Sequence, residues 1–125
     1  MVGAIAEHAR RHGDFAVVSV AAAGRRAADG TWPSLRVALG GVADRAILVE
    51  RASALLTGSR LEADIVRRAG EACVEASDPP SDVRASADYR RHLIPIYLER
   101  VVDLLRTRAT GPGAGDGGGA ARGTT

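Results

Sequence analysis

Apolar residues follow two different spacings along the chain, and the change falls near residue 51. Before it, residues 15–23 form a dense run of β-favouring side chains, and residues 33–41 alternate between apolar and polar. Alternation with a period of two is typical of a strand with one buried face. Residues 45–50 are a third short apolar run, so this part of the chain predicts three strands.

The first residues predict a helix instead. Val2, Ile5, Ala6 and Ala9 recur at helical spacing, and Gly13 is placed to end a helix. The strands that follow are separated by short segments with turn-forming residues, such as AADGT at 27–31. Because these connections are compact, we expect the three strands to pair as an antiparallel sheet.

After residue 51 the repeat is helical. Residues 51–58 predict a short helix that ends at Gly58, and Ser59 with Glu62 has the spacing of a capping box for the next helix. That helix is expected to bury Leu61, Ile65, Ala69, Ala72, Cys73 and Ala76. Two prolines within residues 77–82 end it, and a last helix is predicted from about Ser86 to Leu105.

The order α-β-β-β-α-α-α predicts an α+β domain in which helices cover one face of a three-stranded antiparallel sheet. The chain has 125 residues, enough for one domain, which we place at residues 1–109. Half of residues 110–125 are Gly or Pro, with no large apolar side chain. Such a segment cannot offset its ordering entropy by burial, so we expect a disordered tail.

On the last predicted helix, Arg90 is the exception to an otherwise clean separation of polar and apolar faces. It points with Ile94, Tyr97 and Val101, whereas Arg91 lies on the polar stripe that includes Pro95. A buried arginine requires a compensating group. We expect an internal ion pair, with Glu50 as the preferred partner and Asp14 as the second candidate. The alternative is that Arg90 contacts an anion or a cofactor.

Composition and charge exclude several classes of function. All 17 cationic residues are arginine, yet the formal net charge is only +2 and the arginines are scattered, so we expect no nucleic-acid partner. No apolar run approaches the roughly 18 residues of a membrane span, and the first residues do not resemble a signal peptide. We therefore expect a cytoplasmic protein with no membrane partner. The single cysteine, Cys73, is interpreted as a buried hydrophobic residue.

Nothing in the sequence marks a catalytic centre. His8 and His12 are four residues apart and could share one face, but no suitable third ligand lies nearby for zinc. The common nucleotide-binding and nucleophile motifs are absent from the sequence. We predict no catalytic residue and no metal ligand in this chain.

Four stretches in order carry a resemblance to a known family: EHARRHGDFAVVSVAA (7–22), LRVALGGVADRA (35–46), ERASALLTG (50–58) and RASADYRRHL (84–93). Together they resemble the C-terminal domain of the FAD-binding medium subunit of molybdenum hydroxylases, the carbon monoxide dehydrogenase and xanthine dehydrogenase family. The resemblance extends to about residue 108, and the expected α+β order agrees with that family's fold.

The resemblance implies a role in electron transfer that depends on other polypeptides. In the family, the intact subunit carries FAD and passes electrons between an iron–sulfur subunit and an acceptor, and a molybdenum subunit performs the hydroxylation. Most FAD contacts belong to an N-terminal domain with loops resembling A-G-G-T-D-L and T-x-G-G-N, and neither loop occurs in this sequence. Arg10, Arg11 and Asp14, with Gly13 and Phe15, match the segment nearest the flavin and are implied to be cofactor-adjacent. A lysine that approaches the flavin in some members is replaced here by Ala6.

Two functions remain open at this point. The chain is expected to be a detached piece of a flavoprotein subunit, active in oxidoreduction only when a partner supplies the FAD-binding loops and the other subunits assemble. The alternative is a standalone interaction or remnant module without a redox role. The substrate cannot be assigned from this chain, because in the family the molybdenum subunit selects it.

Overall fold

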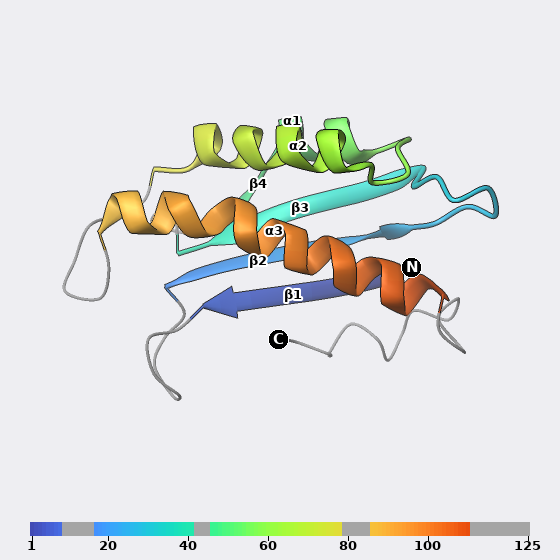
Figure 1. Cartoon of the computed structure of the whole chain (residues 1–125), viewed down its shortest axis with the longest axis horizontal. Helices are drawn as coiled ribbons and strands as arrows, with labels where there is room; N and C mark the ends of the chain where they lie inside the picture. The colour runs from blue at the N-terminus through green and yellow to red at the C-terminus, as the bar shows by residue number, and fades with distance from the viewer. Residues whose placement is uncertain (9–16, 42–45, 79–85, 111–125) are drawn as a thin grey trace.

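The chain begins as a strand and continues with three more before its first helix. A computed structural model describes residues 1–8, 17–41, 46–78 and 86–110. Its strands are β1 (Val2–His8), β2 (Val18–Arg25), β3 (Ser34–Gly40) and β4 (Ile47–Leu48). They form one antiparallel sheet in the order β1-β2-β3-β4, so every neighbour in sequence is a neighbour in space (Figure 1).

All three helices follow the sheet in sequence. They are α1 (Glu50–Leu56), α2 (Ala63–Ala76) and α3 (Ala87–Thr110). α3 crosses β1 and β2, α1 packs on β3, and α2 packs against both α1 and α3 (Figure 1). The helices thus form one layer over one face of the sheet, as the sequence predicts.

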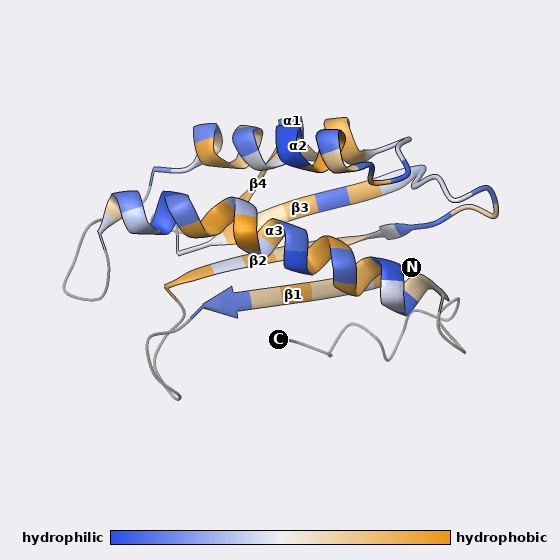
Figure 2. Ribbon diagram, in the orientation of Figure 1, coloured by the Kyte–Doolittle hydropathy of each residue, from blue (hydrophilic) through white to orange (hydrophobic). Residues whose placement is uncertain are grey.

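The core lies between these two layers. Alternate residues of the central strands face the helices and are buried, among them Val18, Val20 and Ala22 of β2. α3 contributes a continuous apolar side to this core, while most of its other residues are polar (Figure 2). Its buried residues include Leu93, Ile94, Tyr97, Leu98, Val101, Val102 and Leu105. The predicted apolar face of the last helix is therefore confirmed, with Leu104 partly buried.

The predicted N-terminal helix is wrong, and the sheet has four strands rather than three. Residues from Val2 to His8 pair along their whole length with β2, from Val2 opposite Gly24 to His8 opposite Val18. Val2, Ala4 and Ala6 also satisfy the alternation of a strand, so the short segment fits both periods. Pairing with β2, a contact that is distant in sequence, decides between them.

Two local predictions around α2 are also corrected. Glu62 is the N-cap and makes no side-chain capping bond, so Ser59 and Glu62 do not form a capping box. The Ser59 hydroxyl donates to the Leu56 carbonyl (2.6 Å), and the Arg60 amide donates to the Glu62 carboxylate (2.9 Å). The predicted buried face is largely confirmed, since Leu61, Ala69, Ala72 and Cys73 are buried. Val66 and Gly70 are buried as well, whereas Ala76 is exposed and Ile65 is partly buried.

Pro95 does not lie on a solvated face as predicted. It is partly buried inside α3, and a Cβ atom added to Gly70 of α2 would lie 3.4 Å from the Pro95 Cβ. Gly70 and Pro95 thus face each other where the two helices pack, with room at position 70 for little more than a methyl group.

Candidate functional site

The residues implied to be cofactor-adjacent, Arg10, Arg11 and Asp14, lie outside the described residues, as does His12. Ala6, which takes the place of the family's lysine, is buried in β1. These assignments stay predictions. The described neighbour of this segment is His8, the last residue of β1, and its surroundings can be given in detail.

His8 is held between two tyrosines of α3. Its Nδ1 shares a hydrogen bond of 3.0 Å with the Tyr97 hydroxyl, and its Nε2 lies 3.4 Å from the Tyr89 hydroxyl. Both rings meet the imidazole edge to face, with centroids 5.7 and 5.9 Å away. The Arg100 guanidinium covers Tyr97 at 4.5 Å from the ring centroid. These contacts fasten α3 to the end of β1.

The cluster around His8 was not foreseen from the sequence. Tyr89 is 43 % exposed. Residues 2–9 were interpreted as a helix, which does not place His8 with Ala4 and Ala6. In a strand, alternation puts all three side chains on the same face of the sheet. Among the described residues, no group of three His, Cys, Asp or Glu side chains is placed to bind a metal ion.

The second face of the sheet is uncovered by helices of the described part of the chain (Figure 1). One row of side chains crosses all four strands there: Ile5 pairs with Ala21, Ala21 with Ala38, and Ala38 with Leu48. We call this row, with exposed Ala23, the open face. Leu48 is 51 % exposed, and the two alanines on the central strands are partly exposed. The row from Ile5 to Leu48 is therefore apolar, and exposed Arg36 lies beside it opposite Ala23.

Arg90 is 1 % exposed, so its predicted location on the buried side of α3 is confirmed. The preferred partner is wrong: Glu50 is an exposed first residue of α1, and no ion pair joins it to Arg90. Arg90 does make a further interaction within the protein. The second candidate, Asp14, lies outside the described residues and stays a prediction. His92 is exposed.

The ends of the helices do not suit a dinucleotide. A cofactor pyrophosphate is commonly held by backbone N–H groups at a helix N-terminus, where negative side chains repel it. Here the first turn of each helix carries an acid: Glu50 in α1, Asp64 in α2 and Asp88 in α3. The Ser86 hydroxyl already accepts the Tyr89 amide at the start of α3 (3.0 Å). The N-termini of the described helices therefore do not suit the FAD pyrophosphate.

Cys73 is buried among core residues of α2, as predicted. Burial raises the pKa of its thiol to about 12, because the thiolate would lose its hydration there. A thiol that stays protonated is a poor nucleophile, so Cys73 is structural. None of the described helices is long and apolar enough to cross a membrane.

Comparison with known proteins gives the family. The model for the CO dehydrogenase flavoprotein C-terminal domain matches residues 4–105, which is most of the chain. The chain belongs to this family.

Two curated relatives come from Paenarthrobacter nicotinovorans. The nicotine 6-hydroxylase medium subunit is 32 % identical over 96 residues, which cover 77 % of this chain and 34 % of the relative. Subunit alpha of the 6-hydroxypseudooxynicotine dehydrogenase complex is 31 % identical over 103 residues, 82 % of this chain and 35 % of the relative. The chain thus spans about a third of the length of the relatives it matches.

Solved structures agree in fold. Reconstituted CO dehydrogenase from Oligotropha carboxidovorans superposes with a TM-score of 0.81 at 27 % identity, over 86 % of this chain and 37 % of the other. Quinoline 2-oxidoreductase from Pseudomonas putida 86 superposes with a TM-score of 0.76 at 30 % identity, over 95 % of this chain and 38 % of the other. The resemblance found in the four sequence stretches is confirmed.

Proposed function

We propose that the chain is the C-terminal domain of the FAD-carrying subunit of a molybdenum hydroxylase-type oxidoreductase. It supports electron transfer through FAD only in assembly with an FAD-binding domain, an iron–sulfur subunit and a molybdenum subunit. The observation that carries this proposal is the family match over residues 4–105, in relatives about three times as long. We also propose that the protein is located in the cytoplasm.

The open face is the proposed contact with the FAD-binding domain. Its apolar row, from Ile5 to Leu48, crosses every strand of the sheet. Alanine at the two central positions leaves the strand backbones accessible to a closely packed partner, and burying the row would remove apolar surface from water. The alternative function, a standalone module without a redox role, gives this face no assigned use.

The chain's own contribution to flavin binding is proposed for Arg10, Arg11 and Asp14, which follow His8 in the sequence. FAD, when bound by the partner domain, supplies the one- and two-electron chemistry. The arginines would provide positive charge near it, and the contacts of His8 with Tyr89 and Tyr97 would fix the strand end from which this segment departs.

Co-expression with an FAD-binding polypeptide that contains the glycine-rich loops tests the proposal. We expect a yellow complex in which flavin absorbance co-elutes with both polypeptides. Leu48→Asp, on the open face, should weaken assembly, because it places a charge against an apolar partner. Ile96→Asp is the matched control, since Ile96 is an exposed apolar residue (37 %) of the helical layer. If no complex forms, or if both variants act alike, the standalone alternative is favoured.

A further inference from the structure

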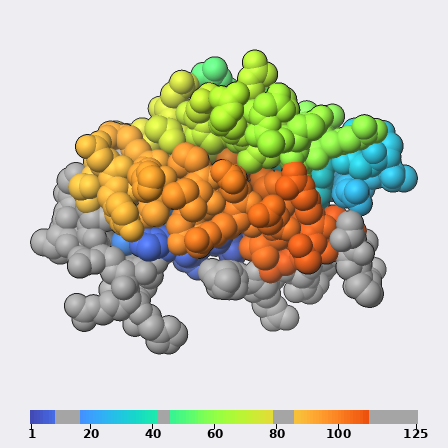
Figure 3. All heavy atoms as spheres, in the orientation of Figure 1, coloured from blue at the N-terminus to red at the C-terminus, as the bar shows by residue number. Residues whose placement is uncertain are grey.

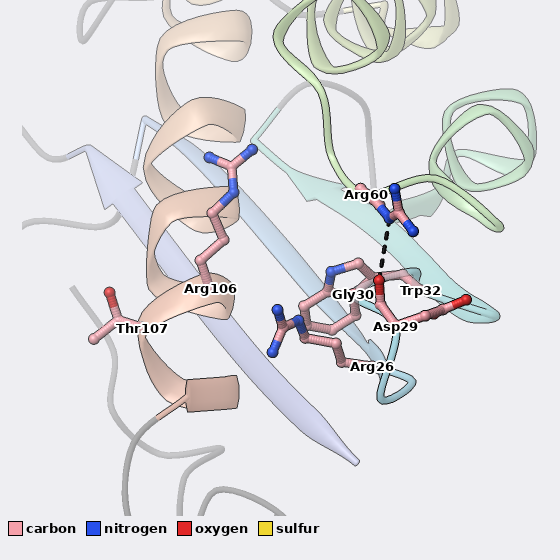
Figure 4. A pocket seen from close by; sticks show the side chains of 7 residues that line it. All are labelled: Arg26, Asp29, Gly30, Trp32, Arg60, Arg106 and Thr107. Carbon is pink, nitrogen blue, oxygen red and sulfur yellow. Dashed lines mark hydrogen bonds between the residues drawn. The ribbon is translucent and has the colours of Figure 1, made fainter.

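A pocket lies at the end of the sheet opposite His8. It sits between the β2–β3 turn, the α1–α2 connection and the last turns of α3, three segments that meet at one end of the molecule (Figure 3). Its volume is about 490 Å³, within the usual range for small-molecule sites. The residues around it are Arg26, Asp29, Gly30, Trp32, Arg60, Arg106 and Thr107 (Figure 4).

The pocket has a fixed frame. The Trp32 amide donates to the Ser59 carbonyl (2.8 Å), and the Gly58 amide donates to the Trp32 carbonyl (2.6 Å). These two bonds tie the β2–β3 turn to the α1–α2 connection. The Trp32 side chain is 1 % exposed and forms the floor. The pocket therefore does not depend on a loop becoming ordered.

Two guanidinium groups converge over Gly30. A Cβ atom at Gly30 would lie 3.7 Å from Nη2 of Arg26 and 3.7 Å from Nε of Arg60. Arg60 donates from Nε to the Asp29 carbonyl (3.1 Å), which leaves its terminal nitrogens without a partner in the described chain. Arg26 has no hydrogen bond or ion pair with described residues. Like charges this close repel, and a bound anion would relieve that repulsion.

The one carboxylate at the pocket is occupied by its own turn. Asp29 accepts the Thr31 hydroxyl (2.7 Å) and the Thr31 amide (3.0 Å). The bond from the Thr31 hydroxyl is the main reason that the pKa of Asp29 is held below its ordinary value. Asp29 is therefore ionised but turned toward Thr31, so it does not form an ion pair with either arginine.

Arg106 places a third positive charge at the pocket. Its guanidinium donates to the Leu61 carbonyl and contacts the Asp103 carboxylate at 3.3 Å. Leu61 has a left-handed backbone (φ 60°), so its carbonyl direction is set by an unusual conformation. With three cationic side chains and one anionic side chain, the lining has a formal excess of two positive charges.

We propose that this pocket binds a small molecule through a phosphate group, with Arg26 and Arg60 as the principal ligands and Arg106 at the rim. One planar guanidinium is enough to bind a carboxylate through two hydrogen bonds, whereas cations from separate directions match a tetrahedral oxyanion. The recessed shape over Trp32 suits a small molecule better than a flat protein surface. This site is remote from His8 and independent of the proposed flavoprotein role.

Trp32 is the single tryptophan, so fluorescence of the full chain reports on the pocket directly. We expect inorganic pyrophosphate to give a saturable change at constant ionic strength and acetate to give none. Line broadening of the pyrophosphate ³¹P resonance is a second measurement that does not depend on the tryptophan signal.

Arginine variants locate the binding. Arg26→Ala and Arg60→Ala should each weaken pyrophosphate binding at least about tenfold, since a charge-assisted hydrogen bond is lost. Arg36→Ala is the control, because Arg36 is an exposed arginine of β3 beyond this pocket. No saturable signal in either measurement, or equal losses in all three variants, would overturn the proposal. Tighter binding of a glutamate-rich peptide than of pyrophosphate would also overturn it.

Discussion

Among the described residues, Arg90 is the one charged side chain that is buried. It is 1 % exposed near the start of α3, where the helix dipole disfavours a cation. Its burial is stable only because other groups of the protein compensate the charge. RASADYRRHL, the stretch that contains it, is therefore explained by packing rather than by catalysis.

Replacement of Arg90 tests this interpretation. Arg90→Ala should lower the free energy of unfolding by roughly 3 to 5 kcal/mol, because the group that compensates it is left buried and unpaired. Arg91 is the matched control: its side chain is 41 % exposed and, within the described part of the chain, pairs with exposed Asp88 alone. Arg91→Ala should cost less than about 0.5 kcal/mol. Similar small losses in urea unfolding of both variants would contradict a structural role for Arg90.

Cys73 makes stability depend on alkaline pH. Burial raises the pKa of its thiol to about 12 in the folded chain, from 9.0 for an exposed thiol. The folded state holds this proton more tightly, so the stabilisation is complete below pH 9 and is lost as pH rises from 9 towards 12. Urea unfolding between pH 7 and about 10 should show a decline that is smaller in Cys73→Ala. An equal decline in both proteins would mean that other groups cause it.

At the scale of elements, the contact between α2 and α3 leaves room for only a small side chain at position 70. Gly70 is buried, and its missing side chain leaves room for Pro95. Gly70→Leu should destabilise the protein by about 1 to 3 kcal/mol through overpacking, despite leucine's better helix propensity. Glu71→Leu, at the exposed neighbouring position, should stay within about 0.5 kcal/mol. Thermal unfolding of the two variants compares them, and no loss in Gly70→Leu would show that the helices can separate freely.

The glycine-rich segment after α3 is predicted to be dispensable. Its composition offers no large apolar side chain, so deletion of residues 111–125 should shift Tm by less than about 4 °C. Deletion from residue 105 onward is the contrasting variant, because it removes fully buried Leu105 and should lower Tm strongly. Calorimetry of both truncated proteins measures these changes in Tm. A large decrease in Tm from the shorter deletion would show that the segment contributes to packing.

Element type was predictable where the chain signals it locally. β3 was found because its alternation is regular, and α3 because its apolar positions extend over many turns. β1 was not, because its short alanine-containing segment fits both periods and gains its identity from seven paired positions with β2. The capping box failed for a similar reason: Ser59 and Glu62 serve a turn that is tied to Trp32 across the pocket.

At the scale of the molecule, the isolated chain should bind FAD only weakly. An acidic side chain in the first turn of each described helix would repel a pyrophosphate bound at that helix N-terminus. The family's glycine-rich loops do not occur in the sequence. A titration followed by flavin fluorescence should give a Kd well above about 1 μM. The same titration with the FAD-binding partner present is the positive control. Sub-micromolar binding by the chain alone would assign the cofactor site to this domain.

Some features of the candidate sites could be predicted from local spacing, whereas others required the tertiary structure, as was the case for the helices and strands. The burial of Arg90 and Cys73 followed from helical spacing alone. The open face required the pairing of all four strands, and the phosphate pocket brings together Arg26, Arg60 and Arg106 from three segments. No periodicity connects residues so far apart in sequence.

The sequence by itself therefore determined the α+β class, the face that each long helix buries and the family to which the chain belongs. These properties depend on the spacing of nearby residues and on the order of motifs, both of which are present in the sequence without any tertiary contact. The tertiary structure alone decided that Val2–His8 is a strand, that Pro95 meets Gly70, and that Glu50 remains in solvent away from Arg90. Each of these depends on which distant residue occupies the neighbouring space, and packing of the two layers settles that question.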